Sequence, residues 1–349
     1  MIIPVTHLIP LTHIRRARML PDKGQVLVNI NQRVKATDIV AEASQMGKHL
    51  ILDVRKALDL WQYDDAEKQI EYKVGEKVEK GDILAQTQGF LPRVVRSSVD
   101  GKVVSIHRGQ IIIEHSAQKL ELTASIPGTI AEILPERGVV IESNGALLQG
   151  VWGNSKIEQG ILLVVDQPAD EELTTTALDI SLRGAVVVAG FVTRPEVLEA
   201  AQEVPVRGLI LSSMSSNLVS LAHKVKYPII LMEGFGQVPM NEAAFHLLIT
   251  NEKREISMNA EWDPIRGEKP EIFIPLPARG SPAQEYGELT PGKTVRVTVP
   301  PYSGQSATLV ALQPGLTTLP NGKRVSAAKI RLSNSLIVTI PIANLDVLE

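Results

Sequence analysis

The spacing of hydrophobic and polar positions changes near residues 170 and 280 of the chain. Before the first change, short β-branched runs such as "GKVVSI" and "GQIIIE" alternate with glycine or Lys/Glu turns, which is typical of strands and hairpins. Between the two changes, unbroken apolar runs alternate with segments of helical spacing. After the second change, short strands return. The pattern predicts a multidomain β and α/β protein.

The first part of the chain contains an internal repeat. "INQRVKATDIVAEA" (30–43) aligns with "VGEKVEKGDILAQT" (74–87), and "SSVDGKVVSIHRGQIIIE" (97–114) resembles "ASIPGTIAEILPERGVVIE" (124–142). Such self-similarity indicates a duplicated structural unit. Between the first pair, apolar residues in "GKHLILDVRKALDLW" fall at helical spacing, which predicts a helical insertion near 46–68.

Two sequence motifs, "VEKGDILA" and "SSVDGKV", characterise this region. They resemble the barrel-sandwich hybrid domains of lipoyl and biotinyl carriers and of Rnf-type electron-transport subunits. The resemblance implies a duplicated barrel-sandwich hybrid over residues 1–170. In carriers a modified lysine lies in the turn between the two motifs, but here that turn reads "QTQGFLPR". We therefore expect no covalent cofactor. Phe90 and Leu91 either contact a protein partner at an exposed tip or fold back onto the barrel.

Residues 178–277 are expected to form a small α/β domain. The runs "RGAVVVAG", "VRGLILSS" and "YPIILMEG" predict buried strands, and the helical segments between them predict a parallel sheet. Ligands bind such sheets beyond the carboxyl ends of the strands. The candidate ligand-binding residues at that edge are Gly190, Ser212, Ser213, Glu233, Gly234 and Gly236. The alternative is a structural edge of ordinary turns, with Glu233 capping a neighbouring turn or pointing to solvent, and we favour it because no nucleotide-binding motif is present.

A Pro- and Gly-rich linker, 278–288, precedes a third domain at 289–349. The strands "GKTVRV" and "ATLVAL" and the loop "PYSG" resemble a KOW-type small β-barrel, although Ala307 stands where that motif usually has glycine. We expect this barrel to fold alone. The resemblance makes nucleic acid a possible partner, with candidate contacts at Lys293, Arg296, Tyr302, Lys323 and Arg324.

Composition narrows the chemistry. The chain has no cysteine and a net charge of −3, and its seven histidines do not cluster, so we expect neither thiolate chemistry nor a metal site. The basic stretch "HIRRAR" is interpreted as a solvated surface. The N-terminus does not have the order of a signal peptide, and no apolar run has the length of a membrane span. We expect a cytoplasmic protein without membrane insertion.

These features favour a non-enzymatic adaptor or scaffold of an intracellular assembly, with protein partners and no cofactor. Two alternatives stay open. One is a nucleic-acid-associated factor, near ribosome or polymerase, that acts through the C-terminal barrel. The other is a ligand-binding or enzymatic α/β domain with its site around Ser212 and Glu233.

Overall fold

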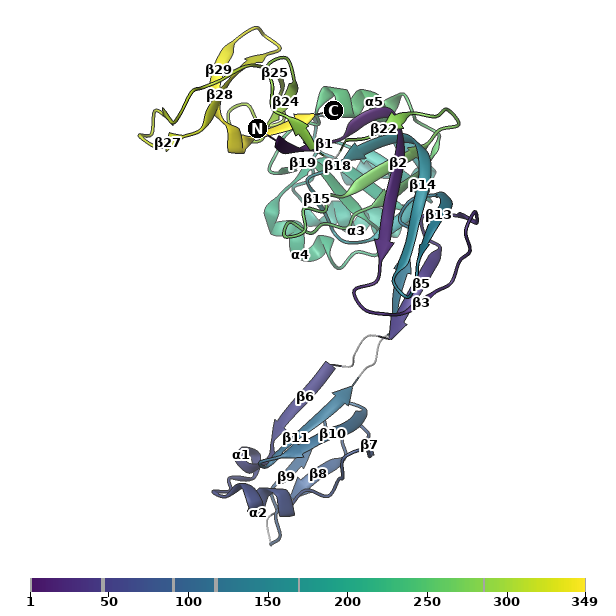
Figure 1. The fold of residues 1–349 in the computed structure, drawn as a ribbon, viewed down its shortest axis with the longest axis vertical. Helices are drawn as coiled ribbons and strands as arrows, with labels where there is room; N and C mark the ends of the chain where they lie inside the picture. Colours follow the sequence, from purple (N-terminus) through teal and green to yellow (C-terminus); the bar gives the residue numbers. More distant parts are fainter. Residues whose placement is uncertain are drawn as a thin grey trace.

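The computed structural model describes residues 2–44, 48–89, 92–115, 119–168, 170–284 and 286–348. The chain is mostly β-structure, and its strands form several separate sheets (Figure 1). The protein therefore has a β-rich multidomain fold, as the sequence predicts. Within the described ranges, no helix is long and apolar enough to cross a membrane.

Residues 8–44 and 119–149 form what we call the N-terminal β unit. Its long strands β2 (Leu8–Met19) and β14 (Gly138–Gln149) pair antiparallel along almost their whole length. The shorter strands are β3 (Gln25–Val26), β4 (Arg33–Val34), β5 (Ile39–Ser44), β12 (Lys119–Thr123) and β13 (Gly128–Leu134). Buried aliphatic side chains, including Ile14, Ile130 and Ile141, fill the space between these strands.

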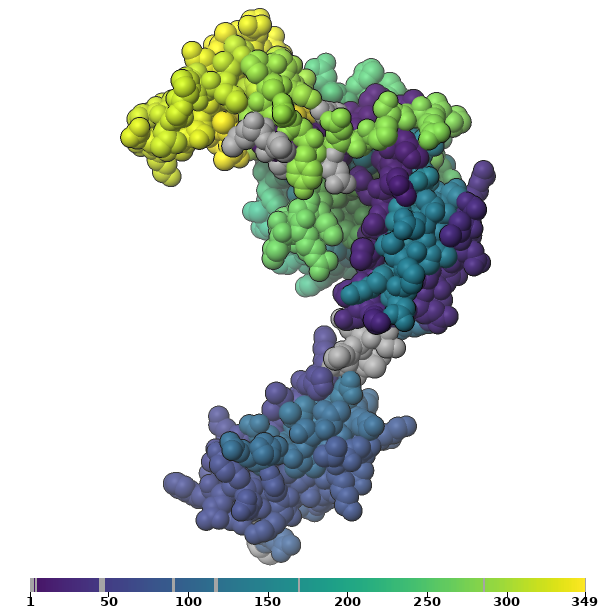
Figure 2. All heavy atoms as spheres, viewed as in Figure 1, coloured from purple at the N-terminus to yellow at the C-terminus, as the bar shows by residue number. Residues whose placement is uncertain are grey.

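Residues 48–115 form the inserted unit, which enters the chain between β5 and β12. Its elements are β6 (Lys48–Asp53), α1 (Val54–Leu58), α2 (Tyr63–Lys68), β7 (Lys77–Val78), β8 (Ile83–Gln86), β9 (Val94–Arg96), β10 (Gly101–His107) and β11 (Gln110–His115). Its core cluster draws every residue from the range 50–113. Figures 1 and 2 show the unit standing apart from the rest of the chain. It therefore has a hydrophobic core of its own.

The inserted unit and the N-terminal β unit share one pattern of strand pairing. Val78 lies opposite Gly101 in the first, and Val34 lies opposite Gly128 in the second. In each unit the following hairpin shifts register at the second residue after that glycine. A Cβ atom on either glycine would lie 2.4 Å from a carbonyl oxygen of the neighbouring strand, so both positions require glycine. The sequence repeat thus corresponds to a repeat in the structure.

The structure differs from the expected helical insertion near 46–68, of which residues 46 and 47 lie outside the described residues. Residues 48–53 form strand β6, which pairs with β11 along six residues. Only α1 and α2 are helical. Asp53 caps α1 by accepting a hydrogen bond from the Lys56 N–H at 2.9 Å. Pairing with a distant strand overrides the helical spacing of this segment.

The α/β unit is built on the twelve-stranded sheet that also contains β14, β13 and β2. Its strands are β15 (Trp152–Gly153), β16 (Ile157–Val164), β17 (Ala185–Ala189), β18 (Gly208–Met214), β19 (Ile229–Phe235), β20 (Glu255–Asn259) and β21 (Glu271–Pro275). Strands β16 to β19 are parallel neighbours. Because β16 precedes residue 178, this unit begins earlier than the sequence predicts, and its sheet continues into the N-terminal β unit without a break.

Helices cover both faces of the parallel strands. Helices α3 (Pro195–Glu203) and α4 (Val219–Ala222) contribute to the core on one face, and α5 (Glu242–Ile249) contributes to the core on the other. Short 3-10 helices η1 (Thr175–Ala177), η2 (Ile180–Leu182) and η3 (Ser216–Leu218) occupy the connections. Because the parallel strands are buried on both sides, their sequences are unbroken apolar runs, as the sequence pattern indicates.

The C-terminal sheet contains seven strands in the order β23-β1-β30-β24-β25-β28-β29. The strands are β1 (Ile2–Thr6), β23 (Tyr286–Glu288), β24 (Thr294–Val297), β25 (Ser306–Leu312), β28 (Ala327–Leu332), β29 (Ile337–Pro341) and β30 (Leu345–Leu348); the hairpin β26 (Thr317–Thr318) and β27 (Arg324–Val325) and helix η4 (Ile342–Asn344) complete the region. The N-terminal strand β1 thus lies between two C-terminal strands, with Val5 in their core.

The segment expected to be a linker, 278–288, is structured in part. Strand β22 (Ser281–Pro282) pairs with β2, and β23 pairs with β1. Both short strands pair with strands from the N-terminal part of the chain, β22 in the twelve-stranded sheet and β23 in the C-terminal sheet. A domain cut at residue 289 would therefore lack two of its strands, β1 and β23.

Candidate functional site

The carboxyl edge of the parallel strands brings together the residues that the sequence proposes for ligand binding. Ser212 and Ser213 are fully buried at the end of β18. The Ser213 hydroxyl accepts a hydrogen bond from the Val238 N–H at 2.9 Å and lies 3.1 Å from the Gly236 carbonyl. Gly190 and Gly234 are buried and Gly236 is exposed. The Ser212 hydroxyl has no hydrogen-bond partner among the described residues, but it does not line either of the two cavities described below.

Glu233 at this edge is covered by the C-terminal sheet. Its Oε2 forms an ion pair with Arg296 Nη1 at 3.4 Å, and its Oε1 accepts a hydrogen bond from the Asn241 N–H at 3.1 Å. Arg296 also donates to the Met232 carbonyl at 2.9 Å and to Asp346 at 2.8 Å. The Glu233 and Arg296 side chains are both 2% exposed. The edge is therefore occupied by the chain itself.

Burial raises the pKa of Glu233 to about 7. The positive charge of Arg296 and the Asn241 N–H act against this rise, whereas the nearby Asp346 carboxylate adds to it. Asn241, which caps α5, also donates from Nδ2 to the Gly304 carbonyl at 3.1 Å and to the Ser306 hydroxyl at 2.7 Å. These contacts fix the C-terminal sheet against the α/β unit.

Arg296 must be removed from the predicted nucleic-acid contacts, because its guanidinium is buried and held by three acceptors. Tyr302 is half-buried and packs against the core of the C-terminal sheet. Lys323 and Arg324 are exposed near the β26–β27 hairpin, and Lys293 is half-buried. The structure therefore does not gather these side chains into one exposed basic face with a stacking aromatic.

The far end of the inserted unit carries an exposed aromatic residue. Trp61, in the loop between α1 and α2, is 95% exposed. Figure 1 places both helices at the end of the unit away from the rest of the chain. An ion pair of 2.9 Å between Arg93 and Asp59 joins this loop to the segment after the β8 hairpin tip. Phe90 and Leu91, the predicted partner contacts at that tip, lie outside the described residues.

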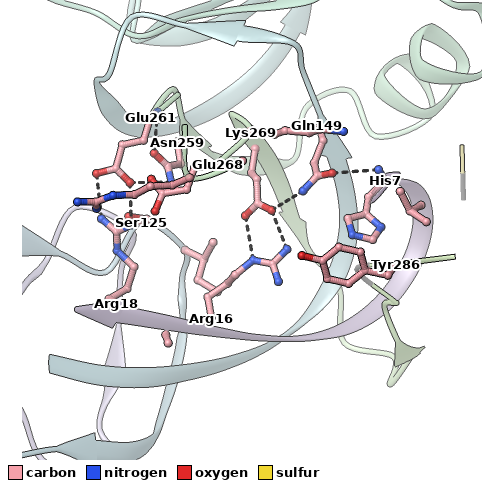
Figure 3. Close-up of a pocket in the computed structure, with 16 residues that line it drawn as sticks. His7, Arg16, Arg18, Ser125, Gln149, Asn259, Glu261, Glu268, Lys269 and Tyr286 are labelled. Carbon is pink, nitrogen blue, oxygen red and sulfur yellow. Dashed lines mark hydrogen bonds and ion pairs between the residues drawn. The ribbon is translucent and has the colours of Figure 1, made fainter. Parts of the chain in front are cut away.

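A polar cavity of about 290 Å³ opens where the N-terminal β unit, the α/β unit and the C-terminal sheet meet. Figure 3 shows Arg18, Ser125, Asn259 and Glu261 at one end and His7, Arg16, Gln149 and Tyr286 at the other. The cavity is lined by Val5, His7, Arg16, Ala17, Arg18, Ser125, Ile126, Gln149, Asn259, Glu261, Arg266, Gly267, Glu268, Lys269, Glu271 and Tyr286. A second cavity is lined by residues such as Arg33 and Pro277, and only two of its lining side chains are charged.

The interior of the polar cavity is organised by a buried carboxylate. Arg16 binds Glu271 through Nη2 at 2.7 Å and Nε at 3.2 Å, and Gln149 donates to the same carboxylate at 2.9 Å. Gln149 in turn accepts from the His7 N–H at 3.1 Å. Burial acts to raise the pKa of Glu271, but the charge and hydrogen bonds of Arg16, with help from Gln149, outweigh it and hold this pKa below its usual value.

A second bidentate pair lies at the other end of the cavity. Arg18 binds Glu261 through Nη1 at 2.7 Å and Nη2 at 3.0 Å, and its Nε donates to the Thr123 carbonyl at 3.1 Å. Asn259 also donates to Glu261. Because Arg16 and Arg18 are two residues apart on strand β2, both side chains project from the same face of the sheet.

Lys269 adds a third cation to the cavity. Its Nζ donates to the buried Thr6 hydroxyl at 2.6 Å. Burial lowers the pKa of Lys269, while the negative charge of Asp346 acts to raise it and Arg296 to lower it. Among the described residues, no group of three His, Cys, Asp or Glu side chains is arranged to hold a metal ion. The cavity is suited to binding a polar molecule through hydrogen bonds and charge.

This cavity could not be predicted from the sequence, because five distant segments build it. Two signals were present: the charged side chains Arg16 and Arg18 at alternate positions of a strand, and the acid Glu271 at the start of the apolar run "EIFIP". Both are unusual for strands that pack in a sheet, and partners are required to bury such charges. The stretch "HIRRAR" is thus not a simple solvated surface, since Arg16 and Arg18 face the cavity.

Comparison with protein families gives no match to this chain, and no curated protein matches its sequence.

Proposed function

We propose that this chain is a non-enzymatic adaptor that presents the inserted unit to a protein partner. The observation that carries the proposal is Trp61, which is 95% exposed on a unit with its own core. Water solvates an indole surface poorly, and Trp and Tyr are enriched among the residues that dominate the energy of protein interfaces. A partner with a pocket for an aromatic side chain would bury it.

The surroundings of Trp61 support a contact with a protein. Tyr63 is half exposed on the adjacent helix, and its ring stacks under the Arg55 guanidinium at 4.9 Å. The Arg93–Asp59 ion pair keeps the Trp61 loop close to the hairpin that follows strand β8. Aromatic side chains and arginine together are characteristic of the centre of an interface.

The fold assignments belong to the same proposal. The matched pairing of Val34 with Gly128 and of Val78 with Gly101 supports two barrel-sandwich hybrid units without a modified lysine. The order of strands β24, β25, β28 and β29 supports a KOW-like arrangement at the C-terminus. Both resemble modules that mediate assembly, and the preference for an adaptor over an enzyme rests here on this fold-level analogy.

Affinity capture from the native cell tests the proposal. The bait proteins are the wild type, Trp61→Ala and, as a matched control, Ile180→Ala, which removes a residue 72% exposed on the α/β unit. We expect one set of proteins to be recovered with the wild type and the control, to be lost with Trp61→Ala, and to survive nuclease treatment. Equal recovery with Trp61→Ala would refute the proposal. Recovery abolished by nuclease would favour the nucleic-acid-associated alternative.

A further inference from the structure

Ser125 is a buried hydroxyl that lines the polar cavity. The residue is 3% exposed, and its Oγ has no hydrogen-bond partner among the described residues. A buried hydroxyl normally forms a hydrogen bond, because removal from water without replacement of the lost bonds is unfavourable. This side chain therefore has an unused donor and acceptor at the cavity wall.

The backbone holds Ser125 in an unusual conformation. Its φ of 67° is in the left-handed region, which a residue with a Cβ atom seldom adopts. The Ser125 N–H donates to the Ala36 carbonyl at 2.8 Å, and this bond fixes the turn between β12 and β13. Glycine would fit this turn without strain, yet the position carries a hydroxyl.

The internal repeat supplies a comparison within the same chain. In the alignment of 97–114 with 124–142, Ser98 of the inserted unit corresponds to Ser125. Ser98 is exposed, and no described cavity adjoins it. Ser98 also lacks the left-handed backbone of Ser125, so both this conformation and the burial of the hydroxyl are properties of the unit that borders the cavity.

The charges next to Ser125 favour an anion. Four cationic side chains line the cavity against three carboxylates. The bidentate pairs Arg18–Glu261 and Arg16–Glu271 offset one another in charge. Among the lining residues this leaves Arg266, which lies 3.5 Å from Asp263, and Lys269 against Glu268. Arg18 uses three of its five N–H groups on Glu261 and Thr123, which leaves two for another acceptor. The Thr123 contact also places this guanidinium beside the turn that carries Ser125.

We propose that the cavity binds a small oxyanion, a carboxylate or a phosphate group, with Ser125 and Arg18 donating hydrogen bonds to it. Arginine presents planar pairs of donors that match both groups. The cavity volume of about 290 Å³ is that of a site for a small molecule. Exposed Arg266, Glu268 and Tyr286 line its rim, so an anion has access from solvent.

Titration calorimetry with inorganic phosphate and, separately, acetate tests the proposal at constant ionic strength. The variants are Ser125→Ala and Ser125→Gly, the second of which relaxes the backbone as well as removing the hydroxyl. Ser98→Ala is the matched control. We expect saturable binding of at least one probe to the wild type. We also expect Kd to rise roughly tenfold in both Ser125 variants and to stay within about twofold in the control.

Three outcomes would overturn the proposal: no saturable binding of either probe, equal affinities in the Ser125 and Ser98 variants, or preferential binding of neutral glycerol. Arg18→Lys provides a second measurement if the Ser125 variants fold poorly. It keeps the positive charge but removes the planar fork, so weaker binding is expected. Undiminished affinity in Arg18→Lys would also contradict the assigned role of the guanidinium.

Discussion

Replacement of Glu233 by glutamine should flatten the dependence of stability on pH. The pKa of Glu233 is raised from 4.5 to about 7 in the folded protein, which at about 1.36 kcal/mol per pH unit corresponds to roughly 3 kcal/mol. A raised carboxyl pKa means that the folded state holds the proton more tightly than the unfolded state. This stabilisation is fully present below pH 4.5 and is lost as the pH rises through about 7. Most of this loss, roughly 2–3 kcal/mol, falls between pH 5 and pH 8.

The groups that face Glu233 set this shift. They are Arg296 and Asp346 on the C-terminal sheet and the Asn241 N–H at the start of α5, with Lys269 near Asp346. Glutamine keeps an acceptor for the Asn241 N–H but does not titrate. The free energy of unfolding in Glu233→Gln should therefore change between pH 5 and pH 8 by roughly 2–3 kcal/mol less than in the wild type.

Urea unfolding at fixed ionic strength measures this difference. In a background of Trp61→Phe and Trp262→Phe, the remaining indole is Trp152, which is buried opposite Leu231 on strand β19 and so reports on the sheet that carries Glu233. The control is Glu242→Gln, which removes an exposed carboxylate from the start of α5, next to Asn241. Identical pH dependence in Glu233→Gln and the wild type would refute the argument that burial controls this carboxyl.

Three further outcomes are expected. Replacement of residues 45–118 by Asn-Gly should leave the melting of the remaining chain unchanged, because Ser44 and Lys119 are directly paired and a two-residue turn can join them; failure of the shortened chain to fold would show that the inserted unit is not independent. Gly128→Ala should lower the free energy of unfolding by roughly 3 kcal/mol, since the new Cβ would lie 2.4 Å from a carbonyl oxygen, and an unchanged urea midpoint would contradict that close approach. The intact mass of natively purified protein should equal the mass of the chain; a lysine adduct of lipoyl or biotinyl size would contradict the expectation of no covalent cofactor.

The sequence predicted those parts of the fold that depend on local pattern. Gly101 and Gly128 mark corresponding strands in both halves of the repeat, and each begins a hairpin of the same register. The alternation of apolar runs and helices predicted the parallel strands β17, β18 and β19. In both cases, residues close together in the sequence determine the backbone conformation, so the local order of residue types is sufficient to predict it.

The remaining features depend on contacts between distant segments. Strand β6 was expected to be helical, because nothing within it shows that β11 lies alongside. The sheet edge at Glu233 was located, but its cover was not, because Arg296 is 63 residues away along the chain. The polar cavity requires Arg18, Ser125 and Glu261 together, and no local spacing relates them. The spacing of hydrophobic and polar residues predicts the type of a single helix or strand. It does not show which distant residues pair with the charged side chains of that element.

The pairing of β1 with β30 has a consequence for how the chain is made. Val5 lies opposite Val347, so β1 finds its parallel neighbour only when a strand far along the chain has been synthesised. Until then, the N-terminal segment has an unpaired edge and an uncovered apolar side chain, the condition in which nascent chains associate wrongly or recruit chaperones. A chain that lacks β30 would leave β1 without its parallel neighbour, so the loss of one strand would impair a segment far away in the sequence.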